Sequence, residues 1–394
     1  MFDAIVVGAR CAGAPTAMLL SRAGYRVLLL DRTAYGTDTL STHLVQVPGV
    51  AALARWGLLE RLRETGCPPI ERVRYEVDDI RLEGCARGVE GQRASYSPRR
   101  NILDPLLIDA AVESGAEYRE RYEVNGLLHD DTGRVVGVRG RSGGKTFTET
   151  ARLVIGADGM RSTVGALVGA PYTVEHPRLT CAYYAYYPKV TDALELYEKP
   201  RSWVAAVPTH GDATLVLAYF PQDRYQEVRA DAQDAYLKQV EDTAPELYGR
   251  IEGLEPLEKL RGTGRQQNFF RKANGPGWVL VGDAGHHKDS ITARGISDGY
   301  QQVELLADRL TDTLGDDPAL LDTALKDFSE DRDQALMGSY EATLGVARLA
   351  PHEQRLSLLR AVQQDEELTS IYFDTIAGIA PVSALLTPKL LALL

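Results

Sequence analysis

The chain has 394 residues, with 44 Lys or Arg against 55 Asp or Glu, so its formal net charge is −11. This length predicts two or three packed lobes, because a single hydrophobic core stops growing before this size. The acidic balance argues against nucleic acid as the main partner, since phosphate binding needs a concentrated basic face. The net charge does not exclude a local basic cleft that binds a small anion.

The four cysteines form neither a CxxC motif nor a zinc-type cluster with histidine, so we expect no metal site. Widely spaced cysteines also indicate a reducing, cytoplasmic location. No basic segment leads into an apolar one at the N-terminus, and no apolar run reaches about 18 residues. We therefore expect neither a signal peptide nor a membrane span. The apolar end, 380–394, is interpreted as a docked helical tail, with contact to lipid or a partner left open.

The first predicted elements are a strand, a turn, a helix and a second strand. Residues 4–7 are a short β-branched run, and Gly8 to Gly13 form the turn. Residues 14–23 have helical spacing, and residues 25–30 are a second apolar strand. Apolar strands without alternation predict a parallel sheet that is covered on both faces.

This opening unit is a candidate dinucleotide site. A glycine turn at a helix N-terminus presents backbone N–H groups and a positive dipole end to a pyrophosphate. Asp31 follows Gly8 at the distance of about 20 residues at which an acid can bind a ribose. Arg10 replaces the second glycine of G-x-G-x-x-G. Its side chain must therefore point away from the cofactor or supply its guanidinium to a phosphate.

Farther along the chain, changes in pattern predict mixed sheets and helices. Residues 71–99 and 179–220 alternate as antiparallel strands do, and residues 100–115 form an amphipathic helix. We expect one polar helix over about 223–246 and mostly helix from about residue 299 onward.

Two further glycine–aspartate motifs each follow a predicted buried strand. One is Gly156-Ala-Asp158-Gly159, and the other is Gly282-Asp283-Ala-Gly285. Asp31 and Asp283 would both lie at the carboxyl edge of the sheet, where ligands bind in open α/β folds.

In this order, the three motifs resemble those of the FAD-dependent monooxygenases of the para-hydroxybenzoate hydroxylase class, whose relatives include flavin halogenases and geranylgeranyl reductases. The resemblance spans roughly residues 4–310. It implies an α/β chain with a Rossmann-like FAD-binding domain of the glutathione-reductase type, an interleaved antiparallel-sheet substrate domain and a C-terminal helical region. The expected bounds are 1–74, 96–165 and 275–325 for the FAD-binding domain, 75–95 and 166–274 for the substrate domain, and 326–394 for the helical region.

The resemblance also assigns roles at the adenosine end of FAD. Gly8 and Gly13 would shape the turn under the pyrophosphate, with Arg10 beside it. Asp31 would bind the adenosine ribose, and Arg32 would lie over the adenine or the pyrophosphate.

Other roles follow nearer the flavin. Arg100 would reach the phosphate side of the flavin, and Val124 would contact adenine through its backbone. Asp158 belongs to the motif linked to both FAD and NAD(P)H. Gly282 and Asp283 would bind the ribityl chain, and Gly295 and Ile296 would place N–H groups near the flavin N1–C2=O edge. Only one glycine fingerprint is present, so we expect no second dinucleotide domain for NAD(P)H.

The expected function is that of an NAD(P)H-dependent monooxygenase in secondary metabolism. Through a flavin C4a-hydroperoxide it would hydroxylate or epoxidise a small aromatic or polycyclic substrate resembling a natural product. The partners would be this substrate and either a second copy of the chain or a separate flavin reductase.

Three alternatives stay open. A partial match to an aromatic element of geranylgeranyl reductases keeps a carbon–carbon double-bond reductase as the first. Halogenation is disfavoured, because flavin halogenases use an early lysine and a Trp-x-Trp pair. Here no lysine precedes Lys145, and Ala205 stands where the second Trp would be. A non-catalytic flavoprotein is the third.

The segment after Asp283 departs from the hydroxylase pattern, since Asp289 and Ser290 replace the usual prolines. His286, His287 and Lys288 would either stabilise an anionic substrate or the reduced flavin, or form an exposed polar loop.

Three side chains are the catalytic candidates. In a strand, Tyr184 and Tyr186 share one face while Tyr183 and Tyr187 share the other, so one pair would line a pocket for a flat substrate. His43 falls near the segment that crosses the flavin in this class. The candidates are His43, Tyr184 and Tyr186, and a purely structural role for each is the competing interpretation.

Overall fold

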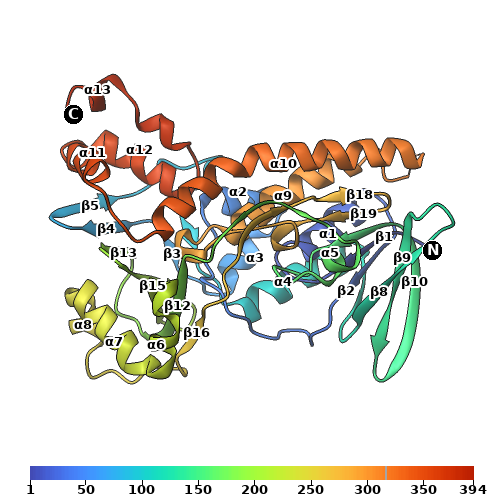
Figure 1. Ribbon diagram of the computed structural model, residues 1–394, viewed down its shortest axis with the longest axis horizontal. Helices are drawn as coiled ribbons and strands as arrows, with labels where there is room; N and C mark the ends of the chain where they lie inside the picture. Colours follow the sequence, from blue (N-terminus) through green and yellow to red (C-terminus); the bar gives the residue numbers. More distant parts are fainter. Residues whose placement is uncertain (316) are drawn as a thin grey trace.

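The computed structural model describes residues 1–315 and 317–394 and confirms a mixed α/β chain with several sheets and a helical C-terminal region (Figure 1). One sheet has the strand order β18-β19-β10-β1-β2-β7, and its strands from β19 to β7 run parallel. The bounds are β1 Phe2–Val7, β2 Val27–Leu30, β7 Glu117–Arg119, β10 Lys145–Gly156, β18 Asn274–Gly275 and β19 Trp278–Leu280.

Both faces of this parallel sheet are covered, as its uninterrupted apolar strands predict. In β1, Ala4 and Val6 pack in the cluster that contains α1 (Gly13–Arg22), α4 (Arg100–Glu113) and α9 (Gly295–Leu310). Ile5 and Val7 point to the opposite face, where α5 (Thr163–Leu167) and a β-meander cover the sheet.

The meander consists of β8 (Glu123–His129), β9 (Val135–Ser142) and the first half of β10, and it forms one end of the molecule (Figure 1). Its β9–β10 turn contains Gly143 and Gly144 at φ 55° and 79°, a left-handed conformation that favours glycine.

A second sheet, of seven strands, has the order β16-β12-β15-β14-β13-β4-β5. Its pairings are antiparallel except between β13 and β4. The strands come from residues 73–84 and 180–263, and the division into domains given above stays a proposal. The bounds are β4 Val73–Val77, β5 Ile80–Gly84, β12 Thr180–Pro188, β13 Leu194–Lys199, β14 Ser202–Thr209, β15 Ala213–Pro221 and β16 Arg261–Thr263.

One face of the seven-stranded sheet is covered by three helices where a single helix was expected over about 223–246. They are α6 (Tyr225–Ala230), α7 (Ala232–Thr243) and α8 (Pro245–Ile251). The breaks fall at Asp231 and Ala244, with φ −140° and −131°. Ala244 precedes a proline, whose ring disfavours helical geometry in the residue before it.

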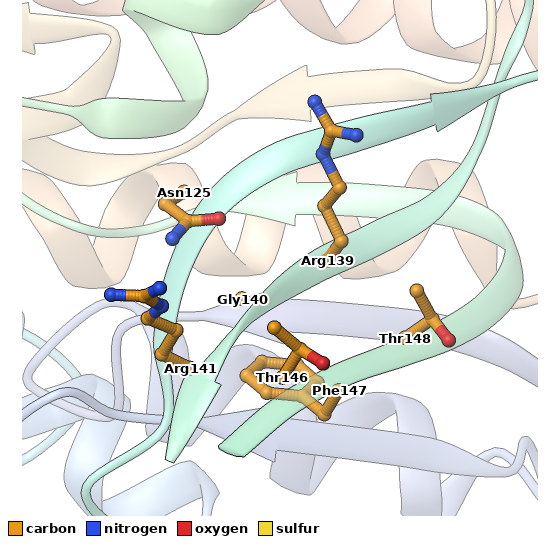
Figure 2. Close-up of a pocket in the computed structure, with 7 residues that line it drawn as sticks. All are labelled: Asn125, Arg139, Gly140, Arg141, Thr146, Phe147 and Thr148. Atoms are coloured by element: carbon orange, nitrogen blue, oxygen red, sulfur yellow. The ribbon is translucent and has the colours of Figure 1, made fainter. Parts of the chain in front are cut away.

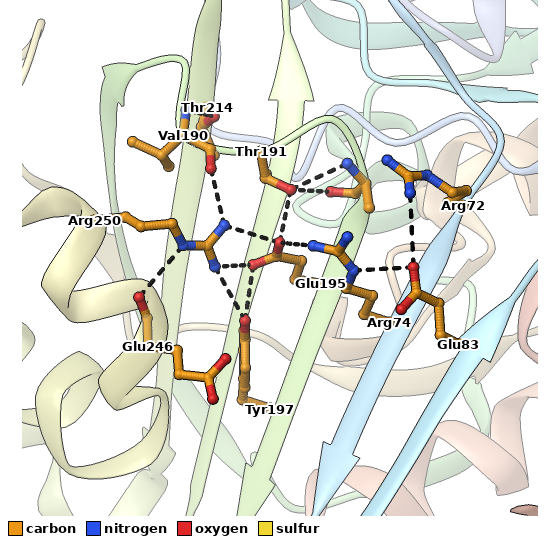
Figure 3. Close-up of polar contacts among 11 residues, drawn as sticks. Arg72, Arg74, Glu83, Val190, Thr191, Glu195, Tyr197, Thr214, Glu246 and Arg250 are labelled. Carbon is orange, nitrogen blue, oxygen red and sulfur yellow. Dashed lines mark hydrogen bonds and ion pairs between the residues drawn. The ribbon is translucent and has the colours of Figure 1, made fainter.

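A buried carboxylate fastens this sheet to α8. Glu195, on β13, is fully buried and binds Arg250 at 2.5 Å and Arg74 at 3.2 Å (Figure 3). The hydroxyls of Thr191 and Tyr197 also donate to it, at 2.7 and 2.8 Å. Every oxygen of this buried group is thus paired, as its burial requires.

The C-terminal helices cover the other face of the seven-stranded sheet, with α10 running along the molecule toward them (Figure 1). Arg355 of α11 binds Glu198 of β13 at 2.8 Å, and Asp374 of α12 accepts the backbone N–H of Arg87 at 2.7 Å. The apolar tail is docked in part, since Leu390 is buried while Leu391 is exposed. No helix built from the described residues is long and apolar enough to cross a membrane.

The remaining elements complete the chain. They are α2 Val47–Arg55, α3 Leu59–Glu64, β3 Pro69–Ile70, β6 Ser95–Tyr96, β11 Tyr172–His176, β17 Asn268–Arg271, β20 His286–His287, α10 Pro318–Ala347, α11 Glu353–Gln363, α12 Glu366–Ala377 and α13 Pro388–Leu391, with short 3-10 turns at Gln222–Arg224, Gly282–Ala284, Ser290–Thr292 and Val382–Leu385.

Candidate active site

The first glycine turn is packed too tightly for any side chain. Gly8 has φ +103°, and a Cβ on it would lie 2.5 Å from the Ala157 carbonyl oxygen. A Cβ on Gly13 would lie 1.7 Å from the carbonyl oxygen of Gly8. The turn therefore brings the N-terminus of α1 against the end of β1, and no side chain caps that helix. The N–H of Ala14 donates to the Arg10 carbonyl at 2.9 Å and Pro15 has no N–H, so among the first three residues of α1 it is Gly13 that can offer an N–H to an anion.

Asp31 lies at the carboxyl end of β2, next to this turn. Its Oδ2 accepts the N–H of Ala9 at 2.8 Å, and its Oδ1 accepts the N–H and the hydroxyl of Thr33, both at 2.7 Å. Arg32 is exposed. The N–H of Tyr122 donates to the Asp31 carbonyl at 2.8 Å, which brings the start of β8, and with it the buried Val124, beside the acid.

Two arginines converge on one carboxylate beside the turn. Arg100 donates to Asp104 at 2.9 and 3.1 Å, and Arg10 lies 4.0 Å from the same carboxylate. The side chain of Arg10 therefore points toward α4. Two guanidinium groups against one carboxylate leave a local excess of one positive charge. Sequence reasoning missed Asp104, although its i,i+4 spacing from Arg100 is a signal for such a pair.

The third motif places a half-buried carboxylate that has no hydrogen-bond partner among the described residues. Within the described chain no hydrogen-bond donor reaches the Asp283 carboxylate, and burial raises its pKa. Arg332, a fully buried residue of α10 that sequence reasoning missed, donates to the carbonyls of Gly285 and Arg271 at 3.2 and 2.9 Å. It fixes the turn that carries Asp283.

The N-terminus of α9 adds a second group of free backbone donors. Gly295 and Ile296 are its first residues, and no side chain caps them. The hydroxyl of Ser297 accepts the N–H of Gln46 at 2.9 Å. This bond joins the first turn of α9 to the segment that contains His43.

In the second motif, the carboxylate of Asp158 finds its hydrogen-bond donors within its own loop. Asp158 accepts the hydroxyl of Ser162 at 2.5 Å and the N–H groups of Thr163 and Val164 at 2.6 and 3.1 Å. Burial raises the pKa of Asp158 and outweighs these bonds, which lower it. Asp158 thus fixes the start of α5.

His43 and Tyr186 form a buried pair. The Nε2 of His43 lies 2.5 Å from the hydroxyl of Tyr186, and both residues are at most 1% exposed. His43 has φ 61°, a left-handed conformation that is uncommon for residues other than glycine. Burial, followed by the nearby charges of Arg100 and Arg99, lowers the pKa of His43 to about 3. The imidazole is therefore neutral at physiological pH.

The two faces of β12 differ in their surroundings, as the alternation predicts. Tyr184 and Tyr186 point to the face that also contacts Leu44 and Ile291. Tyr183 and Tyr187 point into the core beneath α6, α7 and α8. The first pair is thus on the side of the His43 segment and of the loop before α9.

The loop after Asp283 is not an exposed polar loop. His286, Lys288 and Asp289 are all buried. Lys288 binds Asp298 at 2.6 Å, and Asp289 accepts the hydroxyl of Thr180 at 2.7 Å. The hydroxyl of Ser290 lies 3.0 Å from that of Tyr219, so both side chains that replace the usual prolines are held by hydrogen bonds.

One open hollow, of about 360 Å³, lies on the outer meander (Figure 2). It is lined by Asn125, Arg139, Gly140, Arg141, Thr146, Phe147 and Thr148. Among the described residues, no group of three His, Cys, Asp or Glu could hold a metal ion.

These features fit FAD. The uncapped start of α1 and the positive excess at Arg10 and Arg100 suit its pyrophosphate. The half-buried carboxylate of Asp283 suits hydroxyl groups such as those of a ribityl chain, because its oxygens can accept hydrogen bonds and no donor among the described residues reaches them. The uncapped start of α9 suits a carbonyl edge.

Comparisons with known proteins agree. A digeranylgeranylglycerophospholipid reductase of Methanocella arvoryzae is 28% identical over 310 residues, which cover 75% of this chain and 74% of the relative. A 6-methylpretetramide 4-monooxygenase of Streptomyces rimosus is 27% identical over 323 residues, or 76% of this chain and 73% of the relative. The structure of the flavin-dependent brominase Bmp2 has a TM-score of 0.82 at 16% identity, covers 99% of this chain and 96% of its own, and shows the fold alone.

Residues 1–338 match the family described as FAD binding domain. This match covers most of the chain and confirms both the resemblance and the expected cofactor. The chain belongs to the FAD binding domain family and is an FAD-dependent oxidoreductase.

Proposed function

We propose that the protein is a monooxygenase that uses NAD(P)H and O2 to hydroxylate or epoxidise a planar aromatic or polycyclic substrate. The observation that carries this proposal is the buried His43–Tyr186 pair on the sheet face that contacts Leu44 and Ile291. The likeness to the Streptomyces rimosus monooxygenase supports it.

The cofactor would be held by Gly8, Gly13 and Asp31 at its adenosine end and by Asp283 and the start of α9 at its flavin end. When bound, FAD supplies electron transfer from NAD(P)H and the activation of O2. The chain's own residues bind the substrate, orient it and exclude water from it.

In this proposal His43 and Tyr186 orient a substrate hydroxyl. Burial raises the pKa of Tyr186, so its hydroxyl stays protonated, and in this proposal it donates a hydrogen bond to His43 Nε2. The neutral imidazole then carries its proton on Nδ1. That atom is buried and has no partner among the described residues, so it is free to donate to a substrate oxygen.

The test is a turnover assay of the FAD-loaded protein with NADH or NADPH, ¹⁸O2 and a panel of planar phenols and polycyclic aromatics. One ¹⁸O atom in the product, seen by mass spectrometry, supports the proposal. Tyr186→Phe should lower kcat/KM by about tenfold or more, since His43 loses the hydrogen bond that keeps its proton on Nδ1, the atom proposed to bind the substrate. Tyr183→Phe, on the opposite face of the same strand, is the matched control. Cofactor oxidation that yields only hydrogen peroxide across the panel contradicts the proposal.

A double-bond reductase is the second candidate, because the Methanocella arvoryzae reductase matches three quarters of the chain. The same assay separates the two. A reductase gives a product heavier by two hydrogens, without ¹⁸O, and needs no oxygen.

A further inference from the structure

Four charged side chains form an ion-pair cluster beside Tyr186, which we call the Arg99 cluster. It consists of Asp38, Arg99, Glu258 and Arg261. Arg99 lies 2.6 Å from Glu258 and 3.4 Å from Asp38, and Arg261 lies 3.3 Å from each acid. The cluster joins the segment between β2 and α2, the start of α4 and the start of β16.

The Arg99 cluster lies on the side of the sheet where the substrate is proposed to bind. The guanidinium carbon of Arg99 is 4.0 Å from the ring centroid of Tyr186, close enough for a cation–π contact. Arg261 is also near Tyr184, where its charge opposes the rise in pKa that burial causes. The four side chains are between 17% and 39% exposed, so a ligand can reach them.

Asp38 pairs poorly with the two arginines. It uses one oxygen, Oδ2, for both contacts, while its buried Oδ1 has no partner among the described residues. The Nε of Arg99 is likewise buried and unpaired within them. A well-placed carboxylate binds a guanidinium through two parallel hydrogen bonds, which neither group achieves here. The arginines thus have donor capacity that Asp38 does not satisfy.

We propose that Arg99 and Arg261 form a binding site for the carboxylate of an aromatic substrate, and that Asp38 occupies this site until the substrate displaces it. The exchange of one carboxylate for another leaves the net charge of the cluster unchanged. The aromatic ring of the ligand would then lie beside Tyr184 and Tyr186. This inference rests on the proposed function and narrows its substrate class to aromatic acids.

The test measures binding of 2-naphthoate and its neutral isostere 2-naphthamide to the FAD-loaded protein by calorimetry. The wild type should bind the acid at least tenfold more tightly than the amide. Arg99→Gln and, separately, Arg261→Gln should each reduce that preference at least fivefold. Asp38→Asn should tighten binding of the acid several-fold, because the competing carboxylate is gone. Arg265→Gln, an exposed arginine outside the cluster, is the control and should bind as the wild type does.

Equal affinity for the acid and the amide would overturn the proposal. So would a preference that survives both arginine substitutions, or an Asp38→Asn variant that binds the acid no better. In those cases the cluster only fastens the segment between β2 and α2. Because the assay measures binding, it is separate from the ¹⁸O assay: tight binding of the acid without oxygen transfer refutes the monooxygenase and leaves the carboxylate site standing.

Discussion

Gly13→Ala tests directly whether the glycine turn between β1 and α1 binds the pyrophosphate of FAD. The added Cβ would lie 1.7 Å from the carbonyl oxygen of Gly8 and 2.9 Å from its carbonyl carbon. Contact between such atoms needs more than 3 Å, so the two backbone segments must separate by over about 1 Å. Gly8 cannot move freely, because its N–H donates to the carbonyl of Leu30 at 2.7 Å. The start of α1 must therefore shift.

Overpacking of this kind costs about 1–3 kcal/mol. If that cost falls on the FAD-bound form, the affinity for FAD drops by about 5- to 150-fold, since 1.4 kcal/mol is tenfold in Kd. The assay is a titration of the apoprotein with FAD, followed by quenching of flavin fluorescence. Thermal unfolding of the apo forms, followed by circular dichroism, reports separately on folding.

Gly338→Ala is the matched control. Gly338 lies within α10, and no atom lies within 4 Å of a Cβ added there. This variant should keep the wild-type Kd and gain up to about 1 kcal/mol in stability from the helix preference of alanine. An unchanged Kd in Gly13→Ala would refute the assignment of the turn to the pyrophosphate.

Three further predictions concern buried polar groups. Glu195→Ala should lower the free energy of unfolding by about 3 kcal/mol, near the lower end for a broken buried pair because its arginines are partly exposed. Burial alone would raise the pKa of Glu195, but the bond from Arg250 and the other partners lower the pKa overall. The stabilisation from these bonds is therefore present above about pH 4.5 and lost in acid. Acid unfolding of Glu195→Gln should accordingly depend less on pH than that of the wild type. After gel filtration, Arg332→Met should retain at most about a tenth of the FAD that the wild type retains. The substitution leaves the carbonyls of Gly285 and Arg271 without the Arg332 guanidinium, at a cost of about 1–3 kcal/mol each. Full retention would show that the turn does not need Arg332. The His43 ring should show no NMR titration between pH 5 and 8, because its pKa is lowered on folding. Since the unfolded chain binds a proton at this histidine below about pH 6.5 and the folded chain does not, the free energy of unfolding should decrease as the pH falls below that value. An NMR titration midpoint near 6.5 would contradict this.

The sequence predicted those parts of the molecule that local patterns specify. The uninterrupted apolar run of β1 indicated a parallel sheet covered on both faces, and Asp31 was correctly placed at the carboxyl end of the second strand. The alternation of Tyr183, Tyr184, Tyr186 and Tyr187 predicted two faces with different surroundings. In each case a short stretch of chain carries the whole signal.

The rest depends on contacts that no short stretch contains. Asp38, Arg99 and Glu258 meet across more than half of the chain, so their pairing could not be predicted from spacing. The left-handed backbone of His43 was not predicted either, since few residues other than glycine adopt it and no turn motif marks this position. The break at Ala244 is different, because the proline after it was a visible signal.

The topology of the parallel sheet also affects how the chain is made. β10 lies between β1 and β19, so the sheet that would hold FAD cannot close until residues 278–280 have left the ribosome. At about 5–20 residues per second, β10, which is complete at residue 156, waits roughly 6–25 s for β19, its last parallel neighbour. During that time the apolar edge of β10 has no partner strand and is open to association with other nascent chains. A chaperone that shields this edge during synthesis would therefore raise the yield of folded protein more than one that acts on the finished chain.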